Sequence, residues 1–277
     1  MGHLLIAIAL NLVPLIGVWK FGWSGGTVLL LFWVESLLGH FATMVKIRRH
    51  AELTHKRGHF DYTSVDTSGR SYGSYFAHFS QIALIFTFAH GFFLGMILFM
   101  LAMNRPELVM FHVSWDNFKL GFALVVLLVL VDLLIDLPAI GKRSFFWLEN
   151  VAGKRLTRVL MMHLTIIFGF GAMAIFESPM AMLLVFLGLK TLLDAATSMV
   201  KDNAPIDAGY PDKPPALLRF VEKHVKKDSS KKNGPHGDET LDEYWARGKK
   251  ENLQRRQRHE EVVPERELLN SKRHKAK

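Results

Sequence analysis

Charged and imidazole side chains interrupt several stretches of this sequence that are otherwise apolar. A charge at the centre of a lipid bilayer costs at least about 2.5–3.5 kcal/mol, so such residues normally face protein or water and have a partner. Imidazole and carboxylate groups can exchange protons near neutral pH or ligate zinc and iron. We therefore expect these side chains to converge on one intramembrane polar cluster. Its predicted members are Glu35, His78, His90, Asp132, Asp136, Arg158, His163, Lys190 and Asp194.

Helical spacing indicates which members of this cluster share a face. Residues four apart lie one turn from each other, which places Asp132 with Asp136 and Lys190 with Asp194. The second pair could form an ion pair within its own helix. Glu35 has no cation one turn away, so its partner must come from another helix.

A metal ion or a haem group is an open alternative for part of this set. The candidate ligands are Glu35, His90, His163 and Asp194. His78 and His90 are separated by about 18 Å along a helix, so these two cannot share one ion. Gly91 and Gly95 follow His90 directly, and such a glycine pair lets a neighbouring helix approach closely. The pair therefore predicts that His90 faces protein.

Six apolar stretches are long enough to carry these residues through a membrane. A bilayer core about 30 Å thick needs roughly 20 residues of helix, because each residue rises about 1.5 Å. The stretches that qualify are residues 3–22, 25–47, 75–102, 118–140, 156–176 and 179–200. We predict an all-α fold, a polytopic transmembrane helix bundle of about six spans in residues 1–200, followed by a basic cytoplasmic tail in residues 201–277.

The distribution of Lys and Arg predicts the orientation of the bundle, because cytoplasmic loops carry an excess of these residues. The loops after the second and fourth spans carry Lys46, Arg48, Arg49, Lys56, Arg57 and Arg70, and Lys142, Arg143, Lys154 and Arg155. The opposite side carries only Lys20, Arg105 and Lys119. Both termini are therefore expected in the cytoplasm, as an even number of spans requires.

The tail, residues 201–277, combines 19 of the 34 Lys and Arg with 14 acidic residues. Residues 215–227 are predicted to form an amphipathic helix on anionic lipids of the inner leaflet, with a short solvated helix as the alternative. The residues at this membrane surface would be Leu217, Leu218, Phe220, Val221, Lys223 and Lys226. The rest of the tail is predicted to be largely disordered, with a frayed helix as the alternative, and open to a protein partner. Its mixture of acids and bases argues against nucleic-acid binding.

Two further features limit the chemistry that the chain can perform. Cysteine is absent, which excludes disulfides, thiolate catalysis and zinc–thiolate sites. His50, His55 and His59 lie in the loop after the second predicted span. Their spacing matches no zinc-finger pattern, and we expect them to be solvated.

A short internal repeat relates two parts of the chain. Residues 32–39 (FWVESLLG) recur as residues 146–153 (FWLENVAG), so that Glu35 corresponds to Glu149. Parallel repeats occur in transporters, whose sites lie near the repeat interface. The spacings differ, with 43 residues from Glu35 to His78 and 14 from Glu149 to His163, so a chance similarity stays open.

The second predicted span carries W-x-E-x-x-x-G as Trp33, Glu35 and Gly39. Later segments carry Phe76-Ala77-His78, Ala89-His90-Gly91, Arg158 with His163, and Leu189-Lys190-Thr191-Leu192-Leu193-Asp194. In this arrangement residues 10–200 resemble a family of uncharacterised prokaryotic polytopic membrane proteins, filed as a domain of unknown function. The resemblance implies a bacterial inner membrane and supplies no activity.

Three functions are compatible with the polar cluster. The first is proton- or metal-ion-linked transport, in which the Glu, His and Asp side chains would line a polar cavity. The second is a non-catalytic scaffold or assembly factor, because interhelical hydrogen bonds contribute about 0.6–2 kcal/mol each without any activity. The third is an intramembrane metalloenzyme or haem protein. The sequence favours transport first and an enzyme last, because no H-E-x-x-H motif occurs.

Overall fold

A computed structural model describes residues 2–64, 72–104, 112–176, 188–192, 213–216, 218–220 and 240–264. In these residues the regular structure is helical, apart from one isolated antiparallel bridge between Lys56 and Val262. The helices are α1 (Gly2–Phe21), α2 (Gly25–Thr54), η1 (Arg57–His59), α3 (Tyr75–Asn104), α4 (Trp115–Asp136), η4 (Leu137–Lys142), α5 (Phe145–Phe176) and α8 (Leu241–Glu260). Residues 188–192 are also helical.

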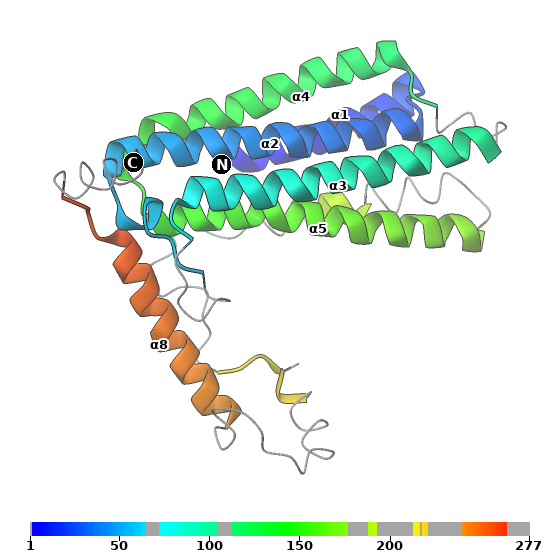
Figure 1. The fold of residues 1–277 in the computed structure, drawn as a ribbon. Coiled ribbons are helices and arrows are strands. Elements are labelled where there is room, and N and C mark those ends of the chain that lie inside the picture. The colour runs from blue at the N-terminus through cyan, green and yellow to red at the C-terminus, as the bar shows by residue number, and fades with distance from the viewer. Residues whose placement is uncertain are drawn as a thin grey trace, which may run out of the picture.

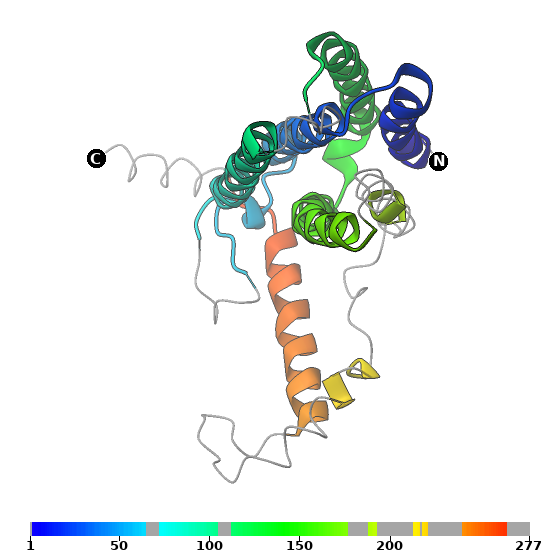
Figure 2. The ribbon, with the colours of Figure 1, turned by 90° about the vertical axis from the view of Figure 1, so that its right-hand side faces the viewer.

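The five long helices α1 to α5 lie side by side as a bundle (Figure 1). Viewed along the bundle, α2 lies between α3 and α4, and α1 lies beside α4 (Figure 2). Because α2 packs against α4, α3 and α5, it is the central helix. The tail helix α8 projects obliquely from the end of the bundle where α2 and α4 end and α3 and α5 begin (Figure 1). We call this end of the bundle the α8 end.

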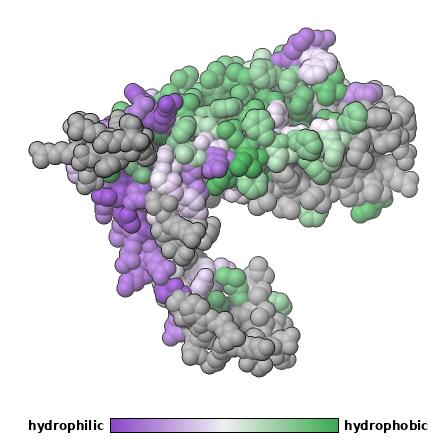
Figure 3. Space-filling view, in the orientation of Figure 1, coloured by the Kyte–Doolittle hydropathy of each residue, from purple (hydrophilic) through white to green (hydrophobic). Residues whose placement is uncertain are grey.

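Within the described part of the chain, three helical segments are long and apolar enough to cross a membrane, namely Gly25–Thr54, Tyr75–Met96 and Trp115–Lys142. A shorter apolar helix, Leu5–Phe21, lies in α1. Hydrophobic side chains cover much of the visible bundle face, whereas the surface around α8 is hydrophilic (Figure 3). The helical bundle is as predicted. The number of six spans stays a prediction, because most of residues 179–200 lie outside the described residues.

Helix α2 begins and ends at local signals. Ser24 caps its start, where the side-chain oxygen accepts a hydrogen bond from the Thr27 N–H at 3.2 Å. His55 follows its last residue in the left-handed region, at φ 48°. The helix thus continues to Thr54, beyond the predicted limit at residue 47. Its last two turns are basic rather than apolar, but they stay helical.

One face of α2 is polar and yet buried inside the bundle. Residues three or four apart line such a face. Its members are Glu35, Gly39, Thr43, Lys46 and His50, all of them buried. This face of the central helix positions the charged groups of the candidate site.

Helix α3 accepts the indole ring of Trp33 at Gly91. A Cβ atom at Gly91 would lie 2.5 Å from Trp33 Nε1, and this nitrogen donates to the Thr87 carbonyl oxygen at 2.9 Å. The predicted close approach at Gly91 is confirmed, as is the burial of His90, which is 2% exposed. A Cβ atom at Gly95 would meet nothing within 4 Å, so among the described residues the second glycine accepts no neighbour.

The tail contains a well-formed helix at residues 241–260, where the sequence allowed either disorder or a frayed helix. Helix α8 starts with a capping box, in which Thr240 and Glu243 bond to each other's backbone N–H groups. Its last turn is held to the bundle by ion pairs. Mixed charge composition alone does not reveal that these charges have fixed partners elsewhere in the chain.

The predicted amphipathic helix at residues 215–227 falls largely outside the described residues. Leu218 and Phe220 are exposed, and Arg219 pairs with Asp242 of α8 at 2.9 Å. Nothing is described for the side chains of Leu217, Val221, Lys223 and Lys226. Contact of this segment with anionic lipids therefore stays a prediction.

Candidate functional site

Asp132 and Asp136 form a buried carboxylate pair near the end of α4. They lie on one face, as their spacing predicts, and are 7% and 5% exposed. Lys46 of α2 reaches both carboxylates, with its Nζ 3.2 Å from Asp132 and 2.5 Å from Asp136. Arg155 of α5 adds a second cation, with Nη2 3.1 Å from Asp132 Oδ2. Three helices thus contribute to a charge-compensated centre.

His3 of α1 completes this centre because both of its ring nitrogens contact the pair. Nδ1 lies 2.7 Å from Asp132 Oδ1, and Nε2 lies 3.1 Å from Asp136 Oδ1. A neutral imidazole carries only one N–H group. Two such contacts therefore require either a protonated ring or one protonated carboxyl group. We call His3, Lys46, Asp132, Asp136 and Arg155 the carboxylate centre.

The carboxylate centre suits a proton better than a metal ion. Ligand atoms of His3, Asp132 and Asp136 all lie within 4.8 Å of one another, a spacing that one ion could bridge. However, Lys46 and Arg155 already balance the two negative charges. A divalent ion would meet both cations at short range in a medium of low dielectric constant, where like charges repel strongly.

A second buried ion pair joins Glu35 of α2 to residues far along the chain. Lys190 Nζ lies 3.3 Å from Glu35 Oε2, donates to Asn11 Oδ1 of α1 at 2.8 Å, and lies 4.7 Å from the centre of the Phe32 ring. The predicted partner from another helical segment is therefore Lys190. Because Lys190 bonds to Glu35, the pairing of Lys190 with Asp194 is not needed to explain its burial.

The other predicted members of the intramembrane cluster do not all join these two sites. His90 is buried. His78 lies one turn into α3, where its ring contacts Tyr72 at 4.4 Å and Tyr62 at 5.0 Å between centroids, so it belongs to an aromatic group at the α8 end. The side chains of Arg158 and His163 and the whole of Asp194 lie outside the described residues. A shared metal site that includes them stays a prediction.

Three members of the carboxylate centre were not predicted from the sequence. Lys46 and Arg155 were assigned to basic loops, and His3 only to the start of the first span. A usable signal was present for Lys46, which continues the spacing of Glu35, Gly39 and Thr43 on one face of α2. The sequence holds no comparable signal for Arg155, whose helix begins 11 residues before the predicted fifth span.

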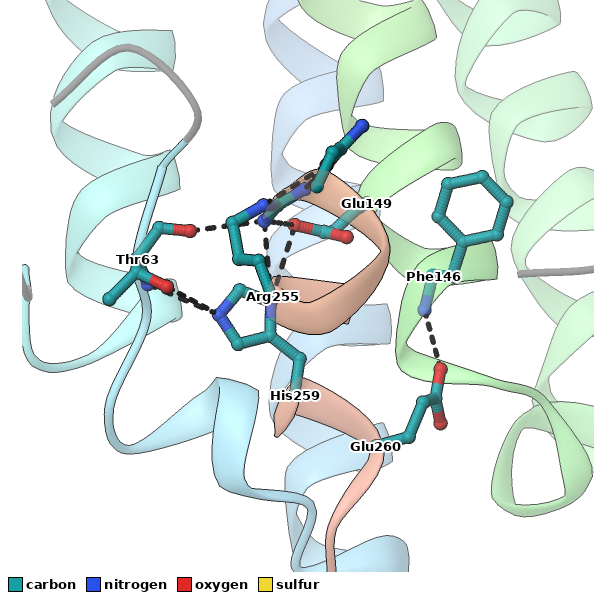
Figure 4. Close-up of polar contacts among 7 residues, drawn as sticks. Thr63, Phe146, Glu149, Arg255, His259 and Glu260 are labelled. Atoms are coloured by element: carbon teal, nitrogen blue, oxygen red, sulfur yellow. Dashed lines mark hydrogen bonds and ion pairs between the residues drawn. The ribbon is translucent and has the colours of Figure 1, made fainter. Parts of the chain in front are cut away.

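A second group of polar contacts binds α8 to the α8 end. Arg255 Nη1 lies 2.7 Å from Glu149 Oε1 of α5 and donates to the Thr63 carbonyl oxygen at 3.0 Å (Figure 4). Burial alone would raise the pKa of the Glu149 carboxyl group. The hydrogen bond and positive charge of Arg255, with the His259 ring 3.7 Å away, outweigh burial and hold this pKa below its ordinary value.

Two further residues of α8 continue this interface. His259 Nε2 accepts a hydrogen bond from the Thr63 N–H at 3.2 Å, and Glu260 Oε1 accepts one from the Phe146 N–H at 2.9 Å (Figure 4). The other oxygen of Glu260 lies 2.6 Å from Lys56 Nζ. Glu260 thus places a negative charge at the N-terminus of α5, where the helix dipole favours it.

His50 and His59 are buried beside this interface, which contradicts the expectation that the loop histidines are solvated. His50 Nδ1 and His59 Nε2 lie 2.7 Å apart, and the two side chains are 0% and 4% exposed. The loop folds back so that the His59 ring meets Phe145 at 4.9 Å. Burial, reinforced by neighbouring positive groups, lowers the pKa of His59 to about 3.

Comparison with known proteins places this arrangement in a family without assigning it a reaction. No curated protein and no solved structure matches the chain. Residues 3–209 match the "Family of unknown function (DUF6498)", and this range includes both buried ion-pair sites but not α8. The predicted resemblance to an uncharacterised family is confirmed, and a prokaryotic source stays a prediction. The chain belongs to the family of unknown function DUF6498.

Proposed function

We propose that this protein is a multi-pass protein of a bacterial inner membrane that translocates protons through the carboxylate centre. Both termini and α8 would lie in the cytoplasm, as the excess of Lys and Arg at the α8 end favours. The coarser statement, a helical protein with segments able to cross a membrane, rests on the helices themselves.

The contact of both His3 nitrogens with carboxylate oxygens carries this proposal. Two hydrogen bonds between the ring and the carboxylates need two protons, but a neutral ring beside two ionised carboxylates has only one. That proton can move between ring and carboxylate without any rearrangement of the helices. The side chain of His3 is 36% exposed, whereas the side chains of Asp132 and Asp136 are 10% and 5% exposed. The ring is therefore the member best placed to exchange protons with its surroundings.

The polar face of α2 supplies further groups toward the middle of the bundle. Glu35 lies about 16 Å from Lys46 along the helix, at the rise of about 1.5 Å per residue. Between them in the sequence, but toward α3 and off this face, His40 Nδ1 contacts Thr87 Oγ1 at 2.8 Å, and both side chains are buried. Chains of buried ionisable groups are a common feature of proton relays in membrane proteins.

A structural role is the second candidate, and a specific observation favours it. The carboxylate centre joins α1, α2, α4 and α5, so the same contacts could serve only to hold these helices together. The two functions make different predictions for the wild-type protein. A scaffold would not translocate protons across the membrane, even when it is fully stable.

The test measures proton entry into liposomes that contain the purified protein and a trapped pH-sensitive dye. A potassium diffusion potential should drive acidification faster than in empty liposomes. Asp132→Asn and His3→Gln should slow it at least about tenfold, because groups that transfer protons contribute about 10²–10⁴-fold to rate. Asp116→Asn is the matched control, because Asp116 lies on the same helix and its side chain is 96% exposed.

Two outcomes would contradict proton translocation. One is a wild-type flux no greater than that of empty liposomes. The other is a wild-type flux that Asp132→Asn and His3→Gln leave unchanged while both variants keep the wild-type thermal stability. Loss of thermal stability in these variants, together with absent wild-type flux, is the result that the scaffold predicts.

A further inference from the structure

Among the described residues, the ion pairs that join α8 to the bundle come from Arg255, the last turn of the helix and Glu261. The ion pairs are Arg255–Glu149, Glu260–Lys56, Glu261–Arg57 and Arg258–Asp61. Val262 also pairs with Lys56 in an antiparallel bridge, with backbone bonds on both sides of it. The first turns of α8 extend away from the bundle (Figure 1). Contacts that are confined to one end of a helix can open together.

His259 lies at the centre of these contacts. Its Nε2 accepts a hydrogen bond from the Thr63 backbone N–H and also lies 3.1 Å from the Thr63 hydroxyl oxygen. The ring is 0% exposed, stacks on Tyr62 at 5.2 Å, and has Arg255 Nη1 3.3 Å from its Nδ1. The Glu149 carboxylate lies 3.7 Å from the ring and bonds to Arg255.

The hydrogen-bond partners of His50 and His59 indicate which ring nitrogen of each residue carries the proton. His50 Nε2 faces the Arg143 carbonyl oxygen at 3.1 Å, so it donates there and its Nδ1 must accept from His59 Nε2. Lys56 Nζ donates to the same carbonyl oxygen at 3.0 Å and to Glu260 at 2.6 Å. A continuous chain of hydrogen bonds therefore runs from the two neutral rings to α8.

We infer that α8 is a pH-sensitive latch, closed on the α8 end while His50 and His59 are neutral and released when they are protonated. A proton added to either ring would place a positive charge in a buried network that already contains Lys56.

Two other titratable groups of the interface, Glu149 and Tyr62, keep their protonation state over the same range of pH. The pKa of Glu149 is held below its ordinary value, and burial raises the pKa of Tyr62, so Glu149 stays ionised and Tyr62 stays neutral. Histidine is the side chain that ordinarily changes charge between about pH 5 and 8. The pKa of His59 is about 3 in the closed state, against 6.5 for an ordinary histidine, so acid favours the open state.

Helix α5 could transmit the effect of latch release to the carboxylate centre. Glu149 and Arg155 lie on the first three turns of this helix, about 9 Å apart along its axis. Glu149 binds the latch, and Arg155 binds Asp132. Control of transport by this route rests on the proposed function, whereas the latch itself does not.

The latch can be tested by distance measurements between two spin labels, because the full-length chain has no cysteine of its own. Labels on Lys142→Cys of η4 and Gln254→Cys of α8 use two exposed positions on either side of the interface. The protein is studied in lipid nanodiscs. The variants are His50→Gln and His59→Gln, and the control is His112→Gln, an exposed histidine at the far end of the bundle.

We expect a short, narrow distance distribution near pH 7.5 and a longer, broader one near pH 5. If the pKa of His59 returns to its ordinary value of 6.5 in the open state, the ratio of open to closed molecules rises about 30-fold between pH 7.5 and pH 5. His50→Gln and His59→Gln should each weaken the response, and His112→Gln should leave it unchanged. The measurement needs no proton flux, so it can fail or succeed independently of the proposed function.

Two results would overturn the latch. One is a wild-type distance that does not change between the two pH values. The other is a wild-type response in the variant that carries both His50→Gln and His59→Gln. A second pair of cysteines, Lys56→Cys with Val262→Cys, replaces the two bridged residues. Its disulfide should hold the labels close near pH 5 until it is reduced. Opening with this disulfide intact would also contradict release at the bridge.

Discussion

Lys46 Nζ and Asp136 Oδ2 lie 2.5 Å apart inside the bundle, although the two residues belong to different helices and are 2% and 5% exposed. Both groups would be costly to bury alone. Each therefore depends on the other, and on Asp132 and Arg155, to remain charged within apolar surroundings. This relationship makes the carboxylate centre sensitive to the loss of any one partner.

Removal of the Lys46 charge should destabilise the bundle more than removal of an exposed lysine. Lys46→Met leaves the two carboxylates with Arg155 and His3 alone, and breaking a buried pair costs about 3–5 kcal/mol. Lys119→Met is the control, because Lys119 is exposed and pairs with an exposed acid. Thermal unfolding in detergent measures the difference. Equal melting temperatures for the two variants would contradict the burial of an obligatory charge.

The two glycines after His90 should respond oppositely to alanine. Gly91→Ala places a Cβ 2.5 Å from the Trp33 indole ring and should cost about 1–3 kcal/mol through overpacking. Gly95→Ala meets nothing within 4 Å and should stabilise α3 by roughly 0.5–1 kcal/mol, because alanine favours a helix interior. Denaturation of both variants under the same conditions checks this. A neutral Gly91→Ala would mean that Trp33 does not pack at this position.

The attachment of α8 should depend on Arg255 far more than on Arg247 of the same helix. Arg255→Ala leaves the buried Glu149 without its closest cation, at a cost of about 3–5 kcal/mol to the closed interface. Arg247 forms a mostly exposed pair with Glu251 one turn away, worth about 0.3–0.5 kcal/mol. Limited proteolysis of the full-length protein should therefore cut the tail much faster in Arg255→Ala. Similar cleavage rates in both variants would argue against the docked position of α8.

The helical bundle could be predicted because its signals are local. Apolar runs of about 20 residues mark α2, α3 and α4, and these are the segments that are long and apolar enough to cross a membrane. The shared face of Asp132 and Asp136 also follows from their spacing alone. That Glu35 needs a partner from elsewhere could likewise be inferred, because no cation lies one turn away from it.

The partners themselves could not be predicted, because they depend on contacts between distant parts of the chain. Lys46 and Arg155 look like members of basic loops until α2 and α5 are seen to bring them to Asp132. Residues 241–260 look disordered until Arg255 meets Glu149. Charged residues with distant partners and charged residues in water have the same composition, and only the fold separates them.

The stability of the α8 end should fall as the pH is lowered from neutral. His59 has a pKa of about 3 when folded and 6.5 when exposed, so the unfolded chain binds the proton more tightly. The contribution of neutral His59 is therefore complete above about pH 6.5 and is lost progressively toward pH 3. Near pH 5 the loss amounts to about 2 kcal/mol, at 1.36 kcal/mol per pH unit. His59→Gln should flatten the dependence of the melting temperature on pH over this range, whereas His112→Gln should not. A wild-type melting temperature that is constant from about pH 7.5 to pH 5 would show that His59 is not buried in the folded protein.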